Sequence, residues 1–285
     1  MKPLISVIIP SHNCAQTIET AIQSILNQTW KNLEVIVIDD GSTDGSEKIV
    51  RNLASRDERV RYFALPWKDP RRINWRGVNI NAGYMARNYG FEQARGEWIT
   101  FQDADDASLL NRIEVQYDLA QKYDALHVSI QWQQLRPELV GKKLDVGAVL
   151  RERSDIVVSA KETSRLAKET KGILMGNWFP HGYVPFIFKW FHLFRPFFFK
   201  KLDPYPGTGG AVFVHRSVLE KIKYRQLDER IWPSTRGRGA DRDFNFQVAE
   251  TFGKSFAFNL PLYLWRVRGQ NPMFSNDEYD KYIIR

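Results

Sequence analysis

The sequence predicts an α/β domain with a mostly parallel, Rossmann-like central sheet flanked by helices. Two observations support this fold class. Short apolar runs alternate with stretches that carry apolar residues at helical spacing, a pattern typical of strand–helix–strand units. Three of the apolar runs end in polar residues, and sheets of this kind bind ligands beyond the carboxyl ends of their strands. The 285 residues suffice for one large domain with a sizeable core.

The first unit begins with the apolar run 4–9, which ends at Pro10 and leads into turn-forming residues up to Asn13. This run predicts a buried parallel strand that opens into a loop at its carboxyl end. The stretch from Thr17 to Gln28 carries apolar residues at helical spacing, so we expect a helix there.

The second unit repeats this order. Residues 35–38 are all Val or Ile and predict a second strand, and a helical pattern covers residues 46–54. Between them lies the run Asp-Asp-Gly-Ser-Thr-Asp-Gly, which is rich in turn formers. We assign Asp39 and Asp44 to turn chemistry, because Asp side chains bond to nearby backbone groups in turns.

The third strand end carries the most informative motif. Residues 98–102 read as a strand, and Asp103, Asp105 and Asp106 follow directly. Two carboxylates one residue apart suit Mn²⁺ or Mg²⁺, which prefer oxygen ligands and often share them with phosphates. An Asp-rich turn alone is weak evidence, but three polar strand ends on one sheet edge indicate a site. For Asp106 we favour a helix N-cap over a supporting role in the site.

Together these motifs resemble the family 2 glycosyltransferases of the GT-A fold. The similarity is carried by SVIIPSHN (6–13), VIVIDDGSTDGS (35–46), NAGYMARNYGFEQARGEWITFQDADD (81–106), GTGGAVFVHRSVLEKI (207–222) and GADRDFNFQV (239–248). The resemblance implies a metal-dependent, inverting transfer of a sugar from a nucleotide-sugar, most often a UDP-sugar, to a hydroxyl group. It also implies a C-terminal extension on the acceptor side, to which Gly207–Gly210 belongs.

The resemblance implies a role for each matching residue on the donor side. Pro10 and Asn13 lie where the family lines the nucleobase and ribose, and Asp40 lies where it bonds the base. Asn81 matches a base or ribose contact. Arg87 matches the arginine that meets the nucleotide or its diphosphate.

The resemblance also implies a metal ligand and a base. Asp103 would reach the ribose, and Asp105 would bind Mn²⁺ or Mg²⁺. An inverting transfer needs a carboxylate to take the proton of the acceptor hydroxyl. We predict Asp241 as this base, with Asp243 as the second choice, although Asp near a helix start also complements the helix dipole. Ala240 replaces the Glu of the family's Glu-Asp pair.

Residues 263–276 resemble the closing segment of the family, in which an Arg-x-His element meets the diphosphate and metal. Arg266 matches the arginine, but Arg268 replaces the histidine. Because arginine keeps its proton, it is a poor metal ligand. We therefore expect Asp105 to be the only protein carboxylate on the metal, with Arg266 and Arg268 holding phosphate oxygens.

Composition restricts the setting and the partners. Cys14 is the only cysteine, so no internal disulfide can form, and the N-terminus lacks the pattern of a secretory leader. Both features favour the cytoplasm. The net charge of +8 favours an anionic partner, while the motifs typical of nucleic-acid binding are absent from the sequence.

Residues 182–201 mix Phe and Trp with basic residues and contain no acidic residue. The run is too short and too often interrupted to span a bilayer. Its composition is typical of a membrane interface, so we expect it to touch the anionic inner face of the cytoplasmic membrane. A lipid-linked glycan acceptor would fit that location. The alternative is that these aromatic residues pack on the sheet or form a subunit interface.

We predict that residues 1–132 form the half that binds the nucleotide-sugar and that residues 133–285 form the acceptor side. Two other functions remain open. One is a nucleotidyltransferase, which the lack of a Gly-rich basic triphosphate loop near the N-terminus disfavours. The other is a non-catalytic partner that binds a nucleotide or a membrane, which only Ala240 and Arg268 support.

Overall fold

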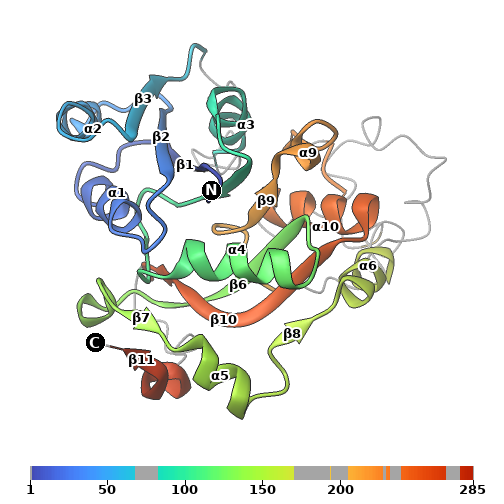
Figure 1. Ribbon diagram of the computed structural model, residues 1–285. Coiled ribbons are helices and arrows are strands. Elements are labelled where there is room, and N and C mark those ends of the chain that lie inside the picture. The colour runs from blue at the N-terminus through green and yellow to red at the C-terminus, as the bar shows by residue number, and fades with distance from the viewer. Residues whose placement is uncertain are drawn as a thin grey trace.

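The computed structural model describes residues 2–67, 83–169, 193, 205–226, 229–231, 239–267 and 277–284. Within these ranges, a nine-stranded sheet with helices on both faces forms the centre of the molecule (Figure 1). This arrangement confirms the α/β fold with a mostly parallel sheet.

The strands of the described ranges are β1 (Ile5–Ser11), β2 (Leu33–Asp39), β3 (Val60–Ala64), β4 (Trp98–Phe101), β5 (Ala107–Ser108), β6 (His127–Gln134), β7 (Lys143–Leu144), β8 (Val157–Val158), β9 (Phe213–His215), β10 (Ser255–Trp265) and β11 (Ile283–Ile284). The helices are α1 (Ile18–Leu26), α2 (Ser46–Ala54), α3 (Tyr84–Gln93), α4 (Arg112–Lys122), α5 (Val146–Glu152), α6 (Ala160–Glu169), α9 (Arg216–Leu219) and α10 (Ala240–Phe252), with 3₁₀ turns η1 (Pro137–Leu139) and η5 (Asp277–Tyr282).

The sheet has the strand order β3-β2-β1-β4-β9-β6-β10-β5, with β8 also paired to β10. The strands β3, β2, β1 and β4 are mutually parallel. Because β9 is antiparallel to both β4 and β6, the parallel pair β6 and β10 runs in the same direction as β1. The carboxyl ends of these six strands therefore point toward one edge of the sheet, where the predicted site residues begin.

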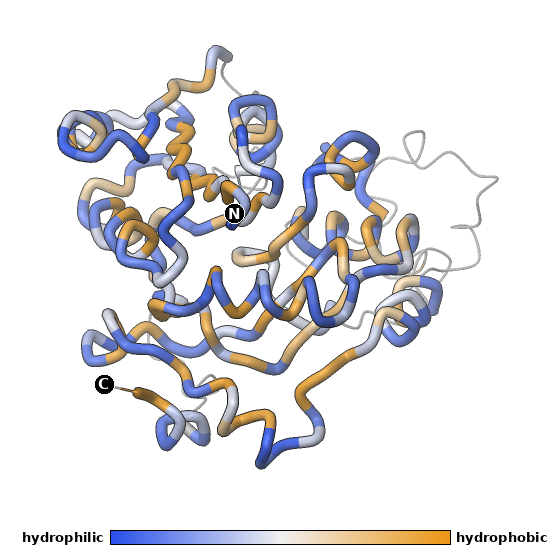
Figure 2. Tube along the Cα trace, in the orientation of Figure 1, coloured by the Kyte–Doolittle hydropathy of each residue, from blue (hydrophilic) through white to orange (hydrophobic). Residues whose placement is uncertain are grey.

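Both faces of the sheet are buried, and the strand sequences follow from this. In β1, Val7 and Ile9 belong to the hydrophobic cluster that includes residues of α1, α2, α4 and α5, whereas Ile8 belongs to the cluster on the other face, with residues of α3, α9 and α10. Successive strand residues point to opposite faces, so a strand covered on both faces is apolar along most of its length. The buried polar exceptions Ser6 and Glu34 are bonded to each other. Figure 2 shows this as hydrophobic colour along the central strands.

The predicted elements are largely confirmed, with one difference at Pro10. The helix expected from Thr17 to Gln28 is α1, and α2 has the expected bounds. Pro10 was expected to stop the first strand, but β1 continues to Ser11. The Ile8 carbonyl accepts from Gln102 N on the side of β4, and the Pro10 nitrogen faces that same side. Because β4 ends at Phe101, the missing N–H of Pro10 costs no strand hydrogen bond.

The predicted boundary at residue 132 lies inside β6, and the same sheet continues across it through β10. The assignment of donor and acceptor roles to the two halves therefore stays a prediction about function. Of the predicted interface segment 182–201, only Leu193 lies within the described residues. Across the described parts of the chain, no helix has the length and apolar character needed to cross a bilayer.

Candidate active site

The loop that follows β2 is built by its own side chains. The Asp39 carboxylate is buried and accepts hydrogen bonds from Ser42 N at 3.2 Å and from Tyr62 Oη at 3.1 Å. The Asp44 carboxylate accepts from Ala15 N at 2.8 Å and so joins this loop to the start of the α1 region. These bonds confirm turn chemistry for Asp39 and Asp44.

The loops after β1 and β2 are tied together beside the predicted nucleoside residues. Asn13 adopts a left-handed backbone conformation with φ of 52°, and its Oδ1 accepts from Thr43 N at 2.8 Å. The Asp40 backbone closes the other side, because its N donates to Ser11 O and its carbonyl accepts from His12 Nδ1, both at 2.8 Å. Asn13 and Asp40 therefore lie in adjoining loops at one sheet edge.

Arg87 joins segments that are far apart in the sequence. It lies on α3 and is buried, with 2% of its surface exposed. Its Nη2 donates to Asp103 Oδ1 at 2.6 Å, and its Nη1 lies 3.9 Å from Asp241 Oδ1. The helix begins after Gly83, where an added Cβ would lie 3.2 Å from Pro10 Cβ. Pro10, Arg87, Asp103 and Asp241 thus gather at the carboxyl ends of β1 and β4.

The charges of this group depend on one another. Burial disfavours the charged form of Arg87, but the Asp241 and Asp103 carboxylates outweigh it and raise the Arg87 pKa. Burial raises the pKa of Asp103 to about 6. The Arg87 charge opposes this rise, and the charges of Asp241 and Asp105 add to it. The site is therefore a cluster of repelling carboxylates with Arg87 buried among them, and the buried Arg230 also interacts with the Asp241 charge.

The loop of residues 103–106 is held by the end of β10. Asp103 N donates to Tyr263 Oη at 3.1 Å, and Tyr263 Oη donates to Asp106 Oδ2 at 2.8 Å. Arg266 N donates to Asp106 Oδ1 at 2.8 Å, and Arg266 Nε donates to the Asp105 carbonyl at 2.7 Å. These contacts place Arg266 beside the loop, while its contact with the diphosphate stays a prediction.

The preferred prediction for Asp106 was wrong. The next helix, α4, begins only at Arg112, and Asn111 is its N-cap residue. The chain first forms β5 directly after Asp106, so Asp106 is too far from the helix to cap it. Asp106 is instead buried, with 1% exposed. Burial and the neighbouring Asp103 charge raise its pKa to about 8. Hydrogen bonds from Arg266 and Tyr263 oppose this rise, because they favour the charged form.

The two candidate bases differ in their surroundings. Asp243 is buried, with Oδ1 2.7 Å from Ile231 N and Oδ2 2.9 Å from Gln247 Nε2. Asp241 is half-buried, and its Oδ1 has no hydrogen-bond partner among the described residues. Gly209 lies directly against it, since an added Cβ there would sit 1.9 Å from Asp241 Cβ. Asp241 therefore keeps one buried oxygen without a hydrogen bond among the described residues, whereas Asp243 fixes the segment around Ile231.

The residues present fit a cation that is held mainly by phosphate and water. Among the described residues, no three His, Cys, Asp or Glu side chains are grouped to hold a metal ion. Asp103 is bonded to Arg87, Asp106 is bonded to Tyr263, and Asp105 lies half-buried between them in the same loop. Mg²⁺ and similar cations are often bound by one or two carboxylates together with substrate phosphates.

Some predicted residues lie outside the described ranges, and some residues of the site were not predicted. Asn81 and Arg268 belong to the first group. Tyr263 belongs to the second group. Tyr263 lies in the apolar run of β10, where the sequence pattern predicts a core residue. Its partners Asp103 and Asp106 are about 160 positions away in the sequence. No local spacing rule predicts such a contact.

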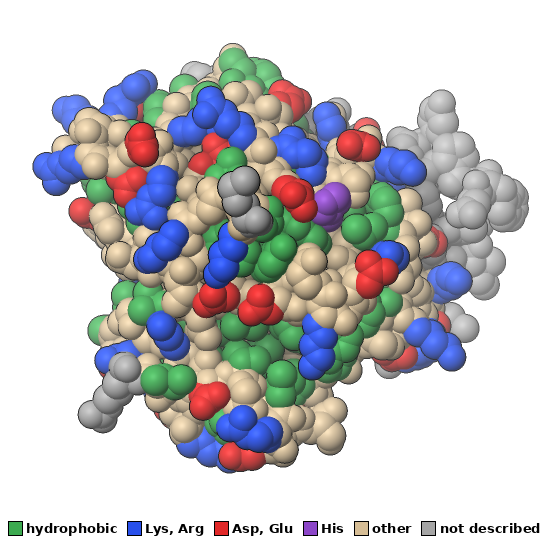
Figure 3. Space-filling model, in the orientation of Figure 1, with side chains coloured by type: hydrophobic (Ala, Val, Ile, Leu, Met, Phe, Trp, Pro, Cys, Tyr) green, Lys and Arg blue, Asp and Glu red, His purple; other side chains and the backbone are tan. Residues whose placement is uncertain are grey.

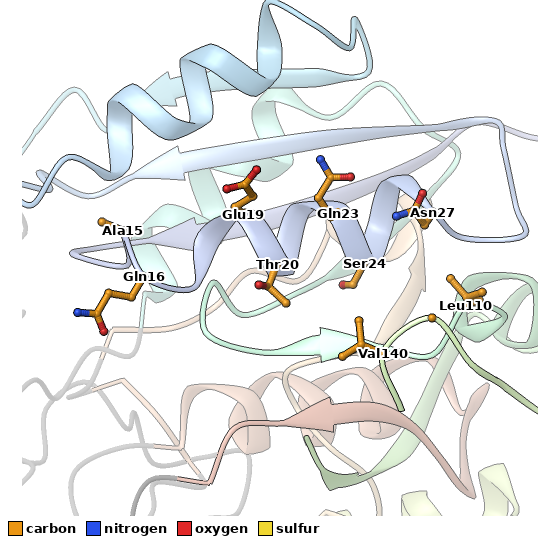
Figure 4. Close-up of a pocket in the computed structure, with 10 residues that line it drawn as sticks. Ala15, Gln16, Glu19, Thr20, Gln23, Ser24, Asn27, Leu110 and Val140 are labelled. Atoms are coloured by element: carbon orange, nitrogen blue, oxygen red, sulfur yellow. The ribbon is translucent and has the colours of Figure 1, made fainter. Parts of the chain in front are cut away.

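A separate pocket of about 650 Å³ lies along α1, between its polar face and the turns at Leu110 and Val140 (Figure 4). Gln16, Thr20 and Asn27 are among its lining residues, and none of the predicted site residues takes part. The predicted site residues therefore lie apart from this pocket. Figure 3 shows Lys and Arg side chains interspersed with Asp and Glu side chains on the face of the molecule that Figure 1 presents.

Comparison with known proteins identifies a matching family and relatives with similar sequences. A family model described as Glycosyl transferase family 2 matches residues 6–222. A Campylobacter jejuni protein, GalNAc(5)-diNAcBac-PP-undecaprenol beta-1,3-glucosyltransferase, is 42% identical over 108 residues, which are 38% of this chain and 31% of that protein. The chain thus spans less than half of the length of the curated relatives that it matches.

Solved structures support the fold. The crystal structure of S. aureus TarS 1-349 in complex with UDP-GlcNAc matches 95% of this chain and 60% of its own, with a TM-score of 0.55 at 16% identity. The mannosyltransferase PcManGT from Pyrobaculum calidifontis, in complex with GDP-Man and Mn²⁺, matches 95% and 59%, with a TM-score of 0.53 at 18% identity. At these identities the likeness concerns the fold alone.

Proposed function

Because the chain belongs to glycosyl transferase family 2, we propose that it transfers a sugar from a UDP-sugar to a hydroxyl group of a glycan, with inversion at the anomeric carbon. One observation carries this proposal. Arg87 contacts Asp103 at 2.6 Å and lies 3.9 Å from Asp241, so the donor-side loop and the candidate base meet at the buried Arg87 guanidinium. A displacement reaction needs its leaving group and its base within reach of one carbon atom.

On the donor side, Pro10, Asn13, Asp40 and Asn81 bind the nucleoside in this proposal. Asp103 bonds the ribose through Oδ2, since its Oδ1 accepts a hydrogen bond from Arg87. The diphosphate is held by the arginines of the site, which are Arg87, Arg266 and Arg268. Guanidinium groups suit this role because they bind phosphate oxygens with two parallel hydrogen bonds.

The Asp105 carboxylate holds Mn²⁺ or Mg²⁺ together with the donor diphosphate. The cation supplies positive charge that neutralises the departing nucleotide. The PcManGT structure, which is a complex with GDP-Man and Mn²⁺, supports metal use for this fold. The surplus of carboxylates around Arg87 also favours binding of a cation.

On the acceptor side, Asp241 takes the proton of the attacking hydroxyl. The hydroxyl oxygen forms a bond to the anomeric carbon on the face opposite the diphosphate. The bond from that carbon to the diphosphate oxygen breaks, and UDP leaves with the electron pair. The Oδ1 of Asp241, which is buried and has no hydrogen-bond partner among the described residues, and the close approach of Gly209 support this role. No observation favours the nucleotidyltransferase or the non-catalytic alternative over this reaction.

The acceptor in this proposal is a glycan on a lipid carrier, at the inner face of a bacterial cytoplasmic membrane. The C. jejuni relative is, by its name, a glucosyltransferase for GalNAc(5)-diNAcBac-PP-undecaprenol, which is an undecaprenol-linked glycan. This relative supports the acceptor class. Residues 182–201 supply the aromatic and basic composition that an interfacial segment needs. Their membrane contact rests on the sequence alone.

The proposal is tested by nucleotide release from a panel of nucleotide-sugars, including UDP-glucose, UDP-GlcNAc, UDP-galactose and GDP-mannose. Wild-type protein with Mn²⁺ should release UDP from at least one UDP-sugar, and chelation with EDTA should stop the release. Asp105→Asn should require much more Mn²⁺ for the same rate. If the wild type releases no nucleotide from any donor, with or without an undecaprenol-linked glycan mixture, the proposed reaction is wrong.

A further inference from the structure

Tyr263, Asp106 and Arg266 connect the end of β10 to the loop that carries the aspartates, and we refer to these three residues as the loop clamp. Its bonds reach mostly main-chain atoms. Tyr263 accepts from the Asp103 N–H at 3.1 Å, and Arg266 Nε donates to the Asp105 carbonyl at 2.7 Å. Asp106 accepts from Arg266 N and from Tyr263 Oη, both at 2.8 Å.

We propose that Tyr263 and Asp106 are positioning residues that hold the loop of residues 103–106 so that Asp105 faces the donor diphosphate and its cation. This inference rests on the proposed glycosyl transfer and adds two residues to its machinery. Neither residue touches the substrate in this account. They act through the backbone on both sides of Asp105.

Burying the polar groups of Tyr263 and Asp106 costs free energy that a purely apolar core would not cost. Tyr263 and Asp106 are each 1% exposed, and both carry polar groups that lose water on folding. Burying a hydroxyl or carboxyl group is unfavourable unless it is fully bonded, and apolar residues of similar volume often pack at least as well. A buried phenol and carboxylate are therefore expected where their directional bonds are needed.

The bonds fix the direction of the Asp105 side chain. The Asp103 N–H is held on one side of Asp105, and the Asp105 carbonyl and the Asp106 carboxylate are held on the other. With the backbone fixed at three points, the Cα–Cβ bond of Asp105 has little freedom to turn. Mg²⁺ and Mn²⁺ sites depend on ligand direction, because Mg²⁺ in particular demands near-octahedral geometry.

Gly210 limits the loop from a third side. A Cβ added at this glycine would lie 2.9 Å from Asp103 Oδ2 and 3.2 Å from Tyr263 Oη. The backbone before β9 therefore packs directly on the clamp without an intervening side chain. Burial also raises the pKa of Tyr263 well above its ordinary value, so the phenol keeps the proton that it donates to Asp106.

The test measures the Mn²⁺ concentration that gives half-maximal thermal stabilisation of the full chain by saturating UDP. Tyr263→Phe removes only the hydroxyl oxygen, and Asp106→Asn replaces one acceptor oxygen with an NH₂ group. Each change should raise the half-saturating Mn²⁺ about 10–100-fold, the usual effect of losing a group that orients a metal ligand. Saturating Mn²⁺ should restore the wild-type affinity for UDP.

Tyr279→Phe is the matched control. Tyr279 is also a fully buried tyrosine near the C-terminus, and its hydroxyl donates to Asn259 O at 2.7 Å, but it lies outside the clamp. This variant should keep the wild-type half-saturating Mn²⁺. The double variant of Tyr263→Phe with Asp106→Asn should have a half-saturating Mn²⁺ no higher than that of the more impaired single variant, because the two residues act as one unit.

The outcomes separate this inference from the proposed function. If the wild type shows no Mn²⁺-dependent stabilisation by UDP, the metal-dependent reaction fails, and the positioning roles fail with it. If the wild type responds but Tyr263→Phe has the same half-saturating Mn²⁺, only the positioning roles are wrong. An equal loss in Tyr279→Phe would also overturn them, because the effect would then be general destabilisation.

Discussion

At the scale of single residues, Asp241 and Asp243 provide the sharpest contrast in the site. Both lie in the first turn of α10, and the sequence alone ranked them only by resemblance. Their surroundings separate them physically. Asp243 is buried and satisfies Ile231 N and Gln247, while Asp241 lies half-buried beside Arg87.

This contrast predicts opposite results for two substitutions. Asp241→Asn should lower kcat for transfer about 10²–10⁴-fold, because it removes a general base, and should leave the melting temperature nearly unchanged. Asp243→Asn should instead lower the free energy of unfolding by about 1–3 kcal/mol, because buried donors lose an acceptor. Kinetics and chemical denaturation of both variants check this. An Asp241→Asn enzyme with wild-type kcat would rule out Asp241 as the base.

Gly209 gives a second prediction at this scale. A Cβ at Gly209 would lie 1.9 Å from Asp241 Cβ, so Gly209→Ala must displace the aspartate or the loop. We expect kcat to fall about 100-fold, since misplacement by about 1 Å can cost that much. Nucleotide binding should persist in a calorimetric titration. Gly147→Ala within α5 is the control and should leave kcat unchanged, since Ala is favourable in helices.

At the scale of elements, the strand ends were predictable and the contacts between distant strands were not. The continuous apolar runs of β1, β2 and β4 predict strands that are buried on both faces, as in a parallel sheet. The polar residues that follow these strands could therefore be placed at one edge of the sheet. Tyr263 depends on the register of β10 beside β6 and β5, which no local pattern encodes. The N-cap prediction for Asp106 was wrong for a related reason, because the two-residue strand β5 lies between Asp106 and the helix.

His127 couples three elements and predicts a pH effect on stability. It lies on β6 and is fully buried, with Nδ1 2.7 Å from Ser255 Oγ on β10 and Nε2 3.2 Å from Asn245 Oδ1 on α10. Burial lowers its pKa to about 4, although the Asn245 bond opposes the shift. In the unfolded chain its pKa is about 6.5.

As the pH falls below about 6.5, the unfolded state therefore takes up a proton before the folded state does. The free energy of unfolding should fall by about 1.4 kcal/mol per pH unit from this group, until the pH nears 4. His127→Gln should remove this slope. Urea unfolding at pH 7, 6 and 5 measures it, and equal slopes in variant and wild type would contradict the prediction.

At the scale of the whole molecule, the +8 charge and the aromatic segment predict binding to anionic bilayers. Co-sedimentation should show more protein bound to vesicles that contain phosphatidylglycerol than to pure phosphatidylcholine vesicles, and salt should weaken the binding. Replacing Phe197, Phe198 and Phe199 with Ser should reduce it strongly. Ile284→Ser, an exposed apolar residue outside the segment, is the control. Unchanged binding of the triple variant would contradict the interfacial role.

A metal-dependent nucleotide-sugar site at this sheet edge is tested by thermal stabilisation of the protein by UDP, GDP, CMP and dTDP, each with and without Mn²⁺. A ligand that binds only the folded state raises the melting temperature by mass action. The account predicts a clear rise with UDP that depends on Mn²⁺ and is lost in Asp105→Asn. No rise with any nucleotide, or a rise that is the same without Mn²⁺, would contradict a metal-dependent nucleotide-sugar site at this sheet edge.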